Sequence, residues 1–188
     1  ITAWETYIRK LRPVASAWIR TAKKVGSGPS VYSPDGKHLS AHTLTTAVLS
    51  FARVIDKLTV GEKQVGVLIP PSGPGIIANM ACLVRGKTVY NLNYTNTPET
   101  MDYCCGVADV KSIITAKVFV EKLKQKGINM DILLSKYKVY YMEDLKEMIP
   151  KRAMILNFLR VLVLPAWYLE LRFFKKVTLD DVATVIFS

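Results

Sequence analysis

Two groups of residues in this chain have types and spacings that could do chemistry, and the first is the tripeptide Gly86-Lys87-Thr88. It matches the end of a phosphate-binding loop, in which backbone N–H groups and a lysine hold phosphate oxygens. However, Ala81 stands where such a loop needs its first glycine. The tripeptide also follows a helical pattern and precedes a strand, whereas a phosphate loop runs from a strand into a helix. We therefore predict that Gly86 ends a helix and that no phosphate binds at this turn.

The second group contains the cysteines and histidines. The cysteines are odd in number and lack CxxC spacing, which favours free thiols in a reducing compartment over a disulfide framework: Cys82, Cys104 and Cys105. We interpret them as small buried apolar residues rather than metal ligands or nucleophiles. His38 and His42 are four residues apart, but His38 precedes a predicted helix cap, so we expect no metal pair. Neither histidine begins an HxxxxD motif.

The stretch 65–94 predicts the β-α-β unit that must position any site. Residues 65–69 form a short apolar run rich in β-branched side chains, and the turn residues 70–73 end it. Apolar residues then recur at helical spacing over 76–84, and a second strand follows at 88–90. Strands joined in this way are parallel, with a right-handed crossover, so a ligand is expected where the strands end.

The remaining segments continue the alternation of helix and strand. A helix capped by Ser40 carries one apolar stripe over 44–58, and a second helix starts at Thr97-Pro98-Glu99. Further expectations are helices around 4–19 and 118–123, a hairpin opening at 31–37, and strands at 112–115 and 138–142. This alternation predicts an α/β fold with a mostly parallel, doubly wound sheet and flanking helices.

Composition and charge divide the chain. Half of the residues are hydrophobic, at 50%, and 22% are charged, which suffices for one domain with a core. The net charge is +11, and segments 1–30 and 151–176 each hold six basic residues and one acidic residue. We expect a basic helical lead-in at 1–30, an α/β core at 31–148, a basic amphipathic helical segment at 149–177 and a final strand at 178–188. Such a concentrated positive charge favours an anionic partner, either phospholipid or nucleic acid.

Segment 149–177 is apolar enough to raise the question of a membrane span. Arg160, Glu170 and Arg172 interrupt it, and each charge near the bilayer centre costs about 2.5–3.5 kcal/mol, so no span is predicted. Two interpretations stay open: a helix pair at the lipid headgroups, or ordinary helices packed on the domain. The first would use cations and aromatic side chains at the ends of the segment: Lys151, Arg152, Trp167, Phe174, Lys175 and Lys176.

The order of these motifs resembles the adenylate-forming acyl ligases, the acyl-CoA and acyl-carrier-protein synthetases. Residues 68–72, Leu-Ile-Pro-Pro-Ser, are similar to the family's Leu-Leu-Pro-Asn-Ser, with Pro71 at the asparagine position. Residues 91–95, Asn-Leu-Asn-Tyr-Thr, are similar to the Met-Asn-Tyr-Thr of one bacterial branch. That branch comprises the bifunctional 2-acylglycerophosphoethanolamine acyltransferase/acyl-acyl carrier protein synthetases. The resemblance covers 33–188 and implies the first part of the large N-terminal domain of an adenylate-forming enzyme.

The resemblance also implies where a cofactor would bind. In the family, an acidic turn and an apolar strand like 178–188 lead into a Ser/Thr/Gly-rich loop that wraps the ATP phosphates. Ser188 matches the first hydroxyl position of that loop, so it is the candidate cofactor-binding residue for ATP with Mg²⁺. The family's catalytic lysine and its other nucleotide contacts lie downstream of this position. We therefore expect an amino-terminal fragment with no catalytic residue, inactive alone.

The resemblance finally implies a function. The parent enzyme would activate a fatty acid as an acyl-adenylate, pass it to acyl carrier protein and serve lysophospholipid reacylation. It would work in the cytoplasm at the inner face of the bacterial membrane, and nucleic acid is not expected as a partner. The alternative is a non-catalytic basic α/β module that binds an anionic lipid surface or nucleic acid. Strongly salt-dependent DNA binding would favour the nucleic-acid version.

Overall fold

The computed structural model describes residues 2, 6–7, 11–32 and 38–187. The labelled helices and strands are, in chain order, α2 (Val14–Val25), β1 (Pro29–Tyr32), β2 (His38–Ser40), α3 (Ala41–Leu58), β3 (Gln64–Leu68), α4 (Gly73–Val84), β4 (Thr88–Asn91), α5 (Pro98–Val107), β5 (Ser112–Thr115), α6 (Lys117–Gln125), α7 (Asp131–Leu134), β6 (Lys138–Tyr141), α8 (Met142–Glu147), α9 (Lys151–Val163), α10 (Ala166–Phe173) and β7 (Thr184–Ile186).

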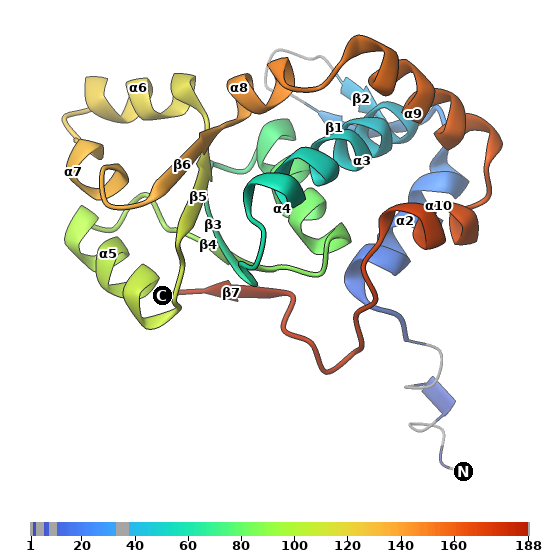
Figure 1. Ribbon diagram of the computed structural model, residues 1–188, viewed down its shortest axis with the longest axis horizontal. Coiled ribbons are helices and arrows are strands. Elements are labelled where there is room, and N and C mark those ends of the chain that lie inside the picture. The colour runs from blue at the N-terminus through green and yellow to red at the C-terminus, as the bar shows by residue number, and fades with distance from the viewer. Residues whose placement is uncertain (1, 3–5, 8–10, 33–37, 188) are drawn as a thin grey trace.

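A five-stranded sheet in the order β6-β5-β3-β4-β7 lies at the centre of the fold, and each neighbouring pair is parallel (Figure 1). The chain moves from β3 to β4 in one direction and from β4 to β5 in the other, past β3. Right-handed crossovers in opposite directions place α4 and α5 on opposite faces of the sheet. The predicted mostly parallel, doubly wound α/β fold is therefore confirmed, and the carboxyl ends of β3 and β4 lie where the connections diverge.

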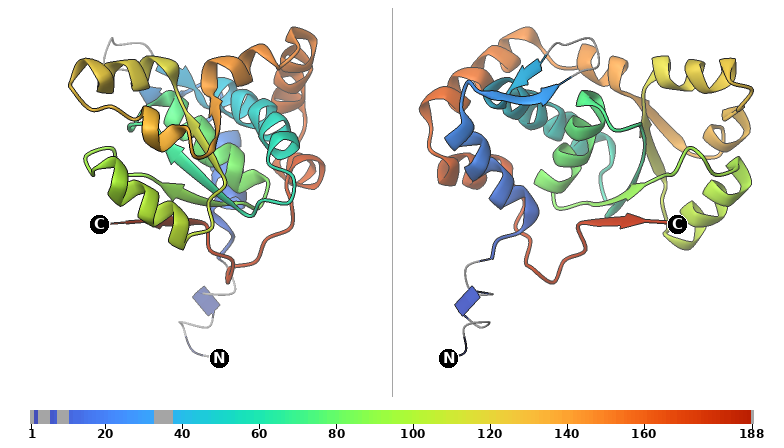
Figure 2. Two further views of the ribbon diagram at one scale, coloured as in Figure 1. Left: turned by 60° about the vertical axis from the view of Figure 1, so that its left-hand side comes forward. Right: turned by 180° about the vertical axis from the view of Figure 1, so that it is seen from behind.

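Strand residues alternate between two cores because successive side chains point to opposite faces. Val65 and Val67 belong to the core beneath α2, α3, α4 and α8 to α10, while Leu68 belongs to the core beneath α5 to α7. Ile113 and Ile114 divide in the same way, and both are fully buried. Each face of the sheet thus covers its own hydrophobic cluster, and helices lie on both faces (Figure 2).

Local signals explain the starts of the main helices. Ser40 Oγ accepts a hydrogen bond from Thr43 N at 3.1 Å at the start of α3, and Thr97 Oγ1 accepts one from Thr100 N at 3.3 Å at the start of α5. These hydroxyls satisfy N–H groups that have no partner within the helix. Both predicted caps are confirmed, as is the role of Gly86, which follows α4 with a φ of +66°.

The amino-terminal region differs from the expectation in its boundaries. The helix expected around 4–19 is interrupted: residues 6–7 are helical, residues 11–13 are not, and α2 begins at Val14 after the extended Pro13. Residues 4 and 8 lie outside the described residues. Strands β1 and β2 pair antiparallel, which confirms the hairpin. Its expected turn at 33–37 lies outside the described residues.

The segment 149–177 forms two helices, α9 and α10, at the end of the molecule opposite to α5, α6 and α7 (Figures 1 and 2). α9 packs mainly against α3, and α10 against α2. An ion pair at 2.9 Å between Arg20 Nε and Glu170 Oε1 joins α2 to α10. None of the described helices combines the length and the apolar composition that crossing a bilayer requires.

Candidate functional site

A cavity of about 420 Å³ lies at the carboxyl edge of the sheet. Its walls come from the turn after β3, the first turns of α4, the segment after β4, and Ile186 of β7. This is the place where a doubly wound sheet binds ligands, because diverging connections leave a crevice between adjacent strands. The position agrees with the expectation that a ligand binds where the strands of 65–94 end.

The walls of the cavity are mainly apolar. Aliphatic and thioether side chains enclose it from four segments of the chain, and its polar side-chain groups are the hydroxyls of Ser72 and Tyr94 and three amides. No Lys, Arg, Asp or Glu is among the described residues that line it. Such a lining suits an apolar ligand fixed by a few polar contacts. The apolar side chains in its walls include Ile69, Ile76, Met80, Leu92 and Ile186.

The turn between β3 and α4 forms one wall and is closed by its own hydrogen bonds. Ser72 Oγ donates to Pro70 O at 2.8 Å and accepts from Gly75 N at 3.3 Å, so it caps α4. Gly75 is required by the close approach of the chain, since a Cβ there would lie 2.8 Å from Pro70 O. The Ser72 hydroxyl therefore already accepts a hydrogen bond from one of the backbone N–H groups at the start of α4 that could otherwise donate to a bound anion.

Two amides join α4, β4 and β7 beside the cavity. Asn79 Nδ2 donates to Asn91 Oδ1 at 3.1 Å, and Asn91 Nδ2 donates to Asn79 Oδ1 at 2.9 Å. Asn91 Nδ2 also donates to Thr184 Oγ1 at 3.2 Å, and Thr184 Oγ1 donates to Val89 O at 3.1 Å. The pair fixes β7 against β4 and thereby sets the direction in which the chain leaves the sheet.

Sequence reasoning singled out Asn91 only as part of a family motif and missed Asn79. The available signal was an amide in the middle of an otherwise apolar helical stretch, which calls for a partner.

Ser188, the candidate cofactor-binding residue, lies outside the described residues. The described chain leads up to it along β7, which pairs parallel with β4 through Tyr90↔Val185 and Asn91↔Ile186. Phe187 continues from the strand and stacks on Tyr90 with 6.1 Å between ring centroids. β7 therefore runs toward the edge of the sheet that carries the cavity.

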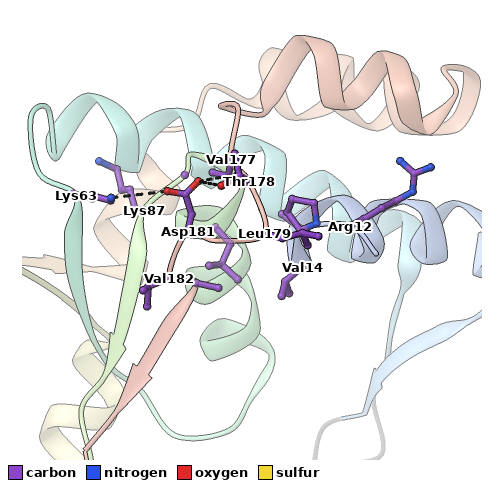
Figure 3. Close-up of a pocket in the computed structure, with 14 residues that line it drawn as sticks. Arg12, Val14, Lys63, Lys87, Val177, Thr178, Leu179, Asp181 and Val182 are labelled. Carbon is purple, nitrogen blue, oxygen red and sulfur yellow. Dashed lines mark hydrogen bonds and ion pairs between the residues drawn. The ribbon is translucent and has the colours of Figure 1, made fainter. Parts of the chain in front are cut away.

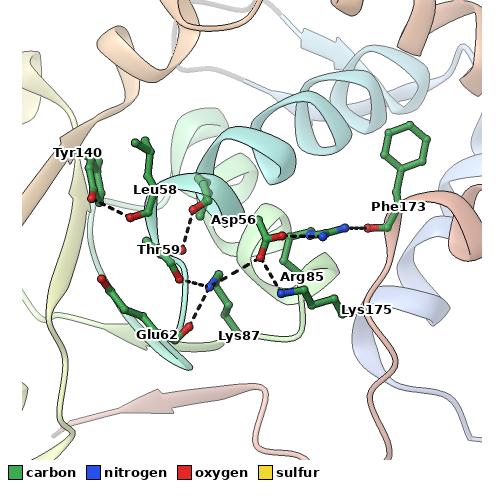
Figure 4. A network of polar contacts seen from close by, with 10 residues as sticks. Asp56, Leu58, Thr59, Glu62, Arg85, Lys87, Tyr140, Phe173 and Lys175 are labelled. Atoms are coloured by element: carbon green, nitrogen blue, oxygen red, sulfur yellow. Dashed lines mark hydrogen bonds and ion pairs between the residues drawn. The ribbon is translucent and has the colours of Figure 1, made fainter.

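At the opposite edge of the sheet, Lys87 is a structural residue. Its side chain is 4% exposed, and Nζ donates hydrogen bonds of 2.8 Å to both Thr59 O and Glu62 O (Figure 4). Asp56 Oδ1 lies 4.0 Å from the same ammonium. Burial, partly offset by Asp56, lowers the pKa of Lys87. The lysine thus holds carbonyls that follow α3, which supports the prediction that this turn binds no phosphate.

Asp56 is the centre of a network that ties α3, α4 and the end of α10 together (Figure 4). Arg85 Nη2 donates to Asp56 Oδ2 at 2.6 Å, Lys175 Nζ donates to Oδ1 at 2.9 Å, and Arg85 Nη1 donates to Phe173 O at 2.5 Å. Burial alone would raise the pKa of Asp56, but the bonds from Arg85 and Lys175 outweigh it and keep the pKa below its ordinary value.

A smaller cavity of about 180 Å³ lies near Lys87, at the edge of the sheet where the strands begin (Figure 3). Arg12, Lys63 and Lys87 contribute to its walls together with Asp181. Asp181 Oδ2 accepts bonds from Thr178 N at 2.7 Å and Thr178 Oγ1 at 3.0 Å, and Oδ1 lies 4.0 Å from Lys63 Nζ. These contacts hold the turn before β7, so this cavity is the weaker candidate for a ligand site.

The cysteines lie inside the domain and show no sign of activation. All three are buried free thiols, as expected: Cys82, Cys104 and Cys105. Burial raises the pKa of Cys82 to about 12 and that of Cys105 to about 11, whereas a nucleophile needs a lowered pKa. His38 lies in β2 and His42 in α3. Over the residues that the structure describes, no group of three His, Cys, Asp or Glu side chains could hold a metal ion.

The residues of the larger cavity do not fit the phosphates of ATP or a Mg²⁺ ion. Phosphate needs cationic side chains or free N–H groups, and Mg²⁺ prefers carboxylate oxygens, whereas the lining offers amides and apolar side chains. The cavity fits an apolar group instead.

An open parallel sheet, helices on both faces and a cavity at the carboxyl edge define the doubly wound α/β class of ligand-binding domains. The AMP-binding enzyme family matches residues 19–188, and the chain belongs to this family. The enzymes of this family are ATP-dependent, adenylate-forming ligases.

Solved structures share the fold at low sequence identity. A Mycobacterium tuberculosis fatty acyl CoA synthetase matches with a TM-score of 0.62 at 12% identity, over 93% of this chain and 32% of that one. A long-chain-fatty-acid-CoA ligase from Archaeoglobus fulgidus matches with a TM-score of 0.59 at 14% identity, over 92% and 34%. O-succinylbenzoate coenzyme A synthetase from Bacillus subtilis, in complex with AMP, matches with a TM-score of 0.56 at 13% identity, over 69% and 32%. The chain thus spans about a third of the length of these structures.

Proposed function

We propose that the protein carrying this chain is an ATP-dependent ligase that activates a fatty acid as an acyl-adenylate. The single observation that carries the choice of acid is the apolar cavity at the carboxyl edge, with Ile76 and Met80 in its wall. An alkyl chain is the ligand such a wall favours, at about 0.8 kcal/mol per buried CH₂ group. Family membership supports the adenylation step.

In this proposal the described residues bind and orient rather than react. The side chains of Ile76, Met80 and Leu92 exclude water from the acyl chain. The amides of Asn79 and Asn91 hold β7 in register with β4, so that β7 is directed toward the edge of the sheet that carries the cavity. ATP with Mg²⁺ would convert a carboxylate oxygen into part of a good leaving group. Ser188 is proposed as the first hydroxyl of the loop that holds the phosphates.

A sequence motif supports a choice of acyl acceptor and of metabolic purpose. We propose acyl carrier protein as the acceptor and lysophospholipid reacylation as the purpose, on the similarity of residues 91–95 to the corresponding branch of ligases. Comparing acyl transfer to acyl carrier protein with transfer to coenzyme A tests this choice. Exclusive transfer to coenzyme A would refute it.

The test of the ligase itself is fatty-acid-dependent ATP–pyrophosphate exchange by the protein that carries this chain. Ile76→Trp narrows the cavity and should raise the KM for a long-chain acid by about 10-fold or more, with the KM for ATP unchanged. The control Val118→Trp changes a side chain that is 61% exposed on α6 and should leave both constants unchanged. Absence of exchange with any carboxylic acid would refute the ligase. Exchange that is unaffected by Ile76→Trp would refute only the role of the cavity.

A further inference from the structure

The outer face of α9 is apolar, which is unusual for a helix on the surface of a domain. After Arg152, each exposed residue of α9 is aliphatic or aromatic: Ile155, Leu156, Phe158, Leu159, Leu162 and Val163. The polar Asn157 is instead turned inward, 2% exposed, and donates to Ser50 Oγ at 3.0 Å. Soluble domains rarely expose apolar surface of this extent, and such patches mark interaction sites.

The same face continues onto α10 with interfacial aromatic residues. Trp167 is 59% exposed, Tyr168 39% and Leu171 78%, while Leu169 and Phe173 anchor the helix in the core. Tryptophan and tyrosine favour the boundary between hydrocarbon and water because their rings are apolar and their N–H and O–H groups are polar. We call the exposed apolar residues of 155–171 the outer face.

Of the three arginines on α3, α9 and α10 that interact here, Arg172 is exposed next to Leu171, whereas Arg53 and Arg160 are half-buried. Arg53 stacks on the Phe173 ring with its Cζ 4.7 Å from the centroid. Among the described residues no carboxylate forms an ion pair with Arg53, Arg160 or Arg172. Burial and the neighbouring guanidinium groups of Arg172, Arg160 and Arg85 lower the pKa of Arg53, so these charges repel one another. An anion nearby would relieve that repulsion.

Charges at the ends of the segment have the same sign. Lys151 and Arg152 are exposed at the start of α9, and Lys176 is exposed after α10. The one acidic residue of 151–176, Glu170, is already paired with Arg20. Charge complementarity therefore favours an anionic partner with an apolar interior, which describes a bilayer of anionic phospholipid.

We propose that the outer face docks this protein on an anionic membrane surface, with α9 and α10 parallel to the bilayer plane. The apolar side chains enter the headgroup region, and the bordering cations contact lipid phosphates. Phe174 and Lys175 were expected to share this role, but Phe174 is half-buried against the core and Lys175 is bonded to Asp56. The docking residues are therefore Val163, Trp167 and Leu171 rather than that pair. The inference goes beyond the ligase proposal and does not depend on it.

The test is co-sedimentation of the chain with vesicles of phosphatidylcholine alone or mixed with phosphatidylglycerol, at low and high salt. We expect binding to the mixed vesicles only, weakened by salt. The variant Val163→Asn with Leu171→Asn changes two residues that are each 78% exposed, so it should fold normally and bind at least about tenfold more weakly. Replacing Arg152 and Arg172 with Gln should weaken binding by about fivefold per charge.

Matched controls change similar residues elsewhere. Val60→Asn with Ile132→Asn removes apolar side chains that are 78% and 73% exposed, and Lys122→Gln with Lys126→Gln removes charges near α6. Both controls should bind as the unmodified chain does. Normal binding by the Val163 and Leu171 variant, or equal binding to neutral vesicles, would overturn the proposal. The proposal would also be overturned if the unmodified chain failed to bind vesicles and instead formed a dimer that the Val163 and Leu171 variant dissociates.

Discussion

Lys87 offers a decisive test of whether its turn stabilises the fold or binds phosphate. Lys87→Met keeps most of the buried aliphatic stem but removes the ammonium that donates to Thr59 O and Glu62 O. The Thr59 carbonyl still accepts a bond from Glu62 N at 3.2 Å, whereas the Glu62 carbonyl loses its partner. An unsatisfied acceptor costs about 1–3 kcal/mol.

The net loss of unfolding free energy expected for Lys87→Met lies near the middle of that range. Glu62 is half-buried, so water can partly replace the lost donor, and removing a buried charge recovers some desolvation energy. Asp56 also keeps its bonds to Arg85 and Lys175. We therefore expect a loss of about 2 kcal/mol in the free energy of unfolding, which corresponds to about 4–8 °C in Tm for a domain of this size.

The assay is urea and thermal unfolding of the variant, alongside calorimetric titration of ATP with Mg²⁺ into the protein that carries the chain. The control Lys63→Met changes a side chain that is 64% exposed on the same edge and should cost less than about 0.5 kcal/mol. Nucleotide affinity should be unchanged in both variants. Unchanged stability of Lys87→Met together with lost ATP binding would refute the structural role and show a phosphate site.

Two further perturbations test the turn and the ionic network. Gly75→Ala places a Cβ 2.8 Å from Pro70 O and should cost about 1–3 kcal/mol in unfolding free energy. The control Gly106→Ala adds a Cβ with nothing within 4 Å and should stabilise α5 by about 0.4–1 kcal/mol. Equal effects of the two substitutions on the unfolding free energy would contradict the steric argument. Asp56→Asn should cost about 2 kcal/mol at neutral pH. Because the folded pKa of Asp56 lies below its ordinary 3.8, its stabilisation is present above pH 3.8 and is lost as the pH falls through the folded value. The unfolding free energies of the unmodified chain and Asp56→Asn should therefore converge in acid, and a constant difference would contradict the ionic role.

Sequence alone determined the features whose causes are local. The capped starts at Ser40 and Thr97 need only a hydroxyl three residues before an N–H group, and the stop at Gly86 needs only a residue that accepts positive φ. The β-α-β unit followed from a β-branched run, turn residues and helical spacing. From the alternation of such elements the parallel, doubly wound class follows, and with it the edge of the sheet where a cavity is expected.

Short helices and exact boundaries were not predictable in this way. α7 and α8 have four and six residues, too few for a repeated apolar spacing to stand out. The start of α2 at Val14 depends on the extended backbone of Pro13 rather than on the apolar pattern that precedes it.

Only the tertiary structure decided which partners distant residues meet. Lys87 finds the carbonyls of Thr59 and Glu62, and Asn79 finds Asn91, because the sheet brings separate elements together. The same holds for α9, where Met154 and Val161 face the core while Leu159 and Val163 face outward. A helical period reports that apolar residues share faces, but both faces of α9 carry them. Packing on α3 selected the inner one and left the other exposed, because the buried Asn157 finds its hydrogen-bond partner in Ser50.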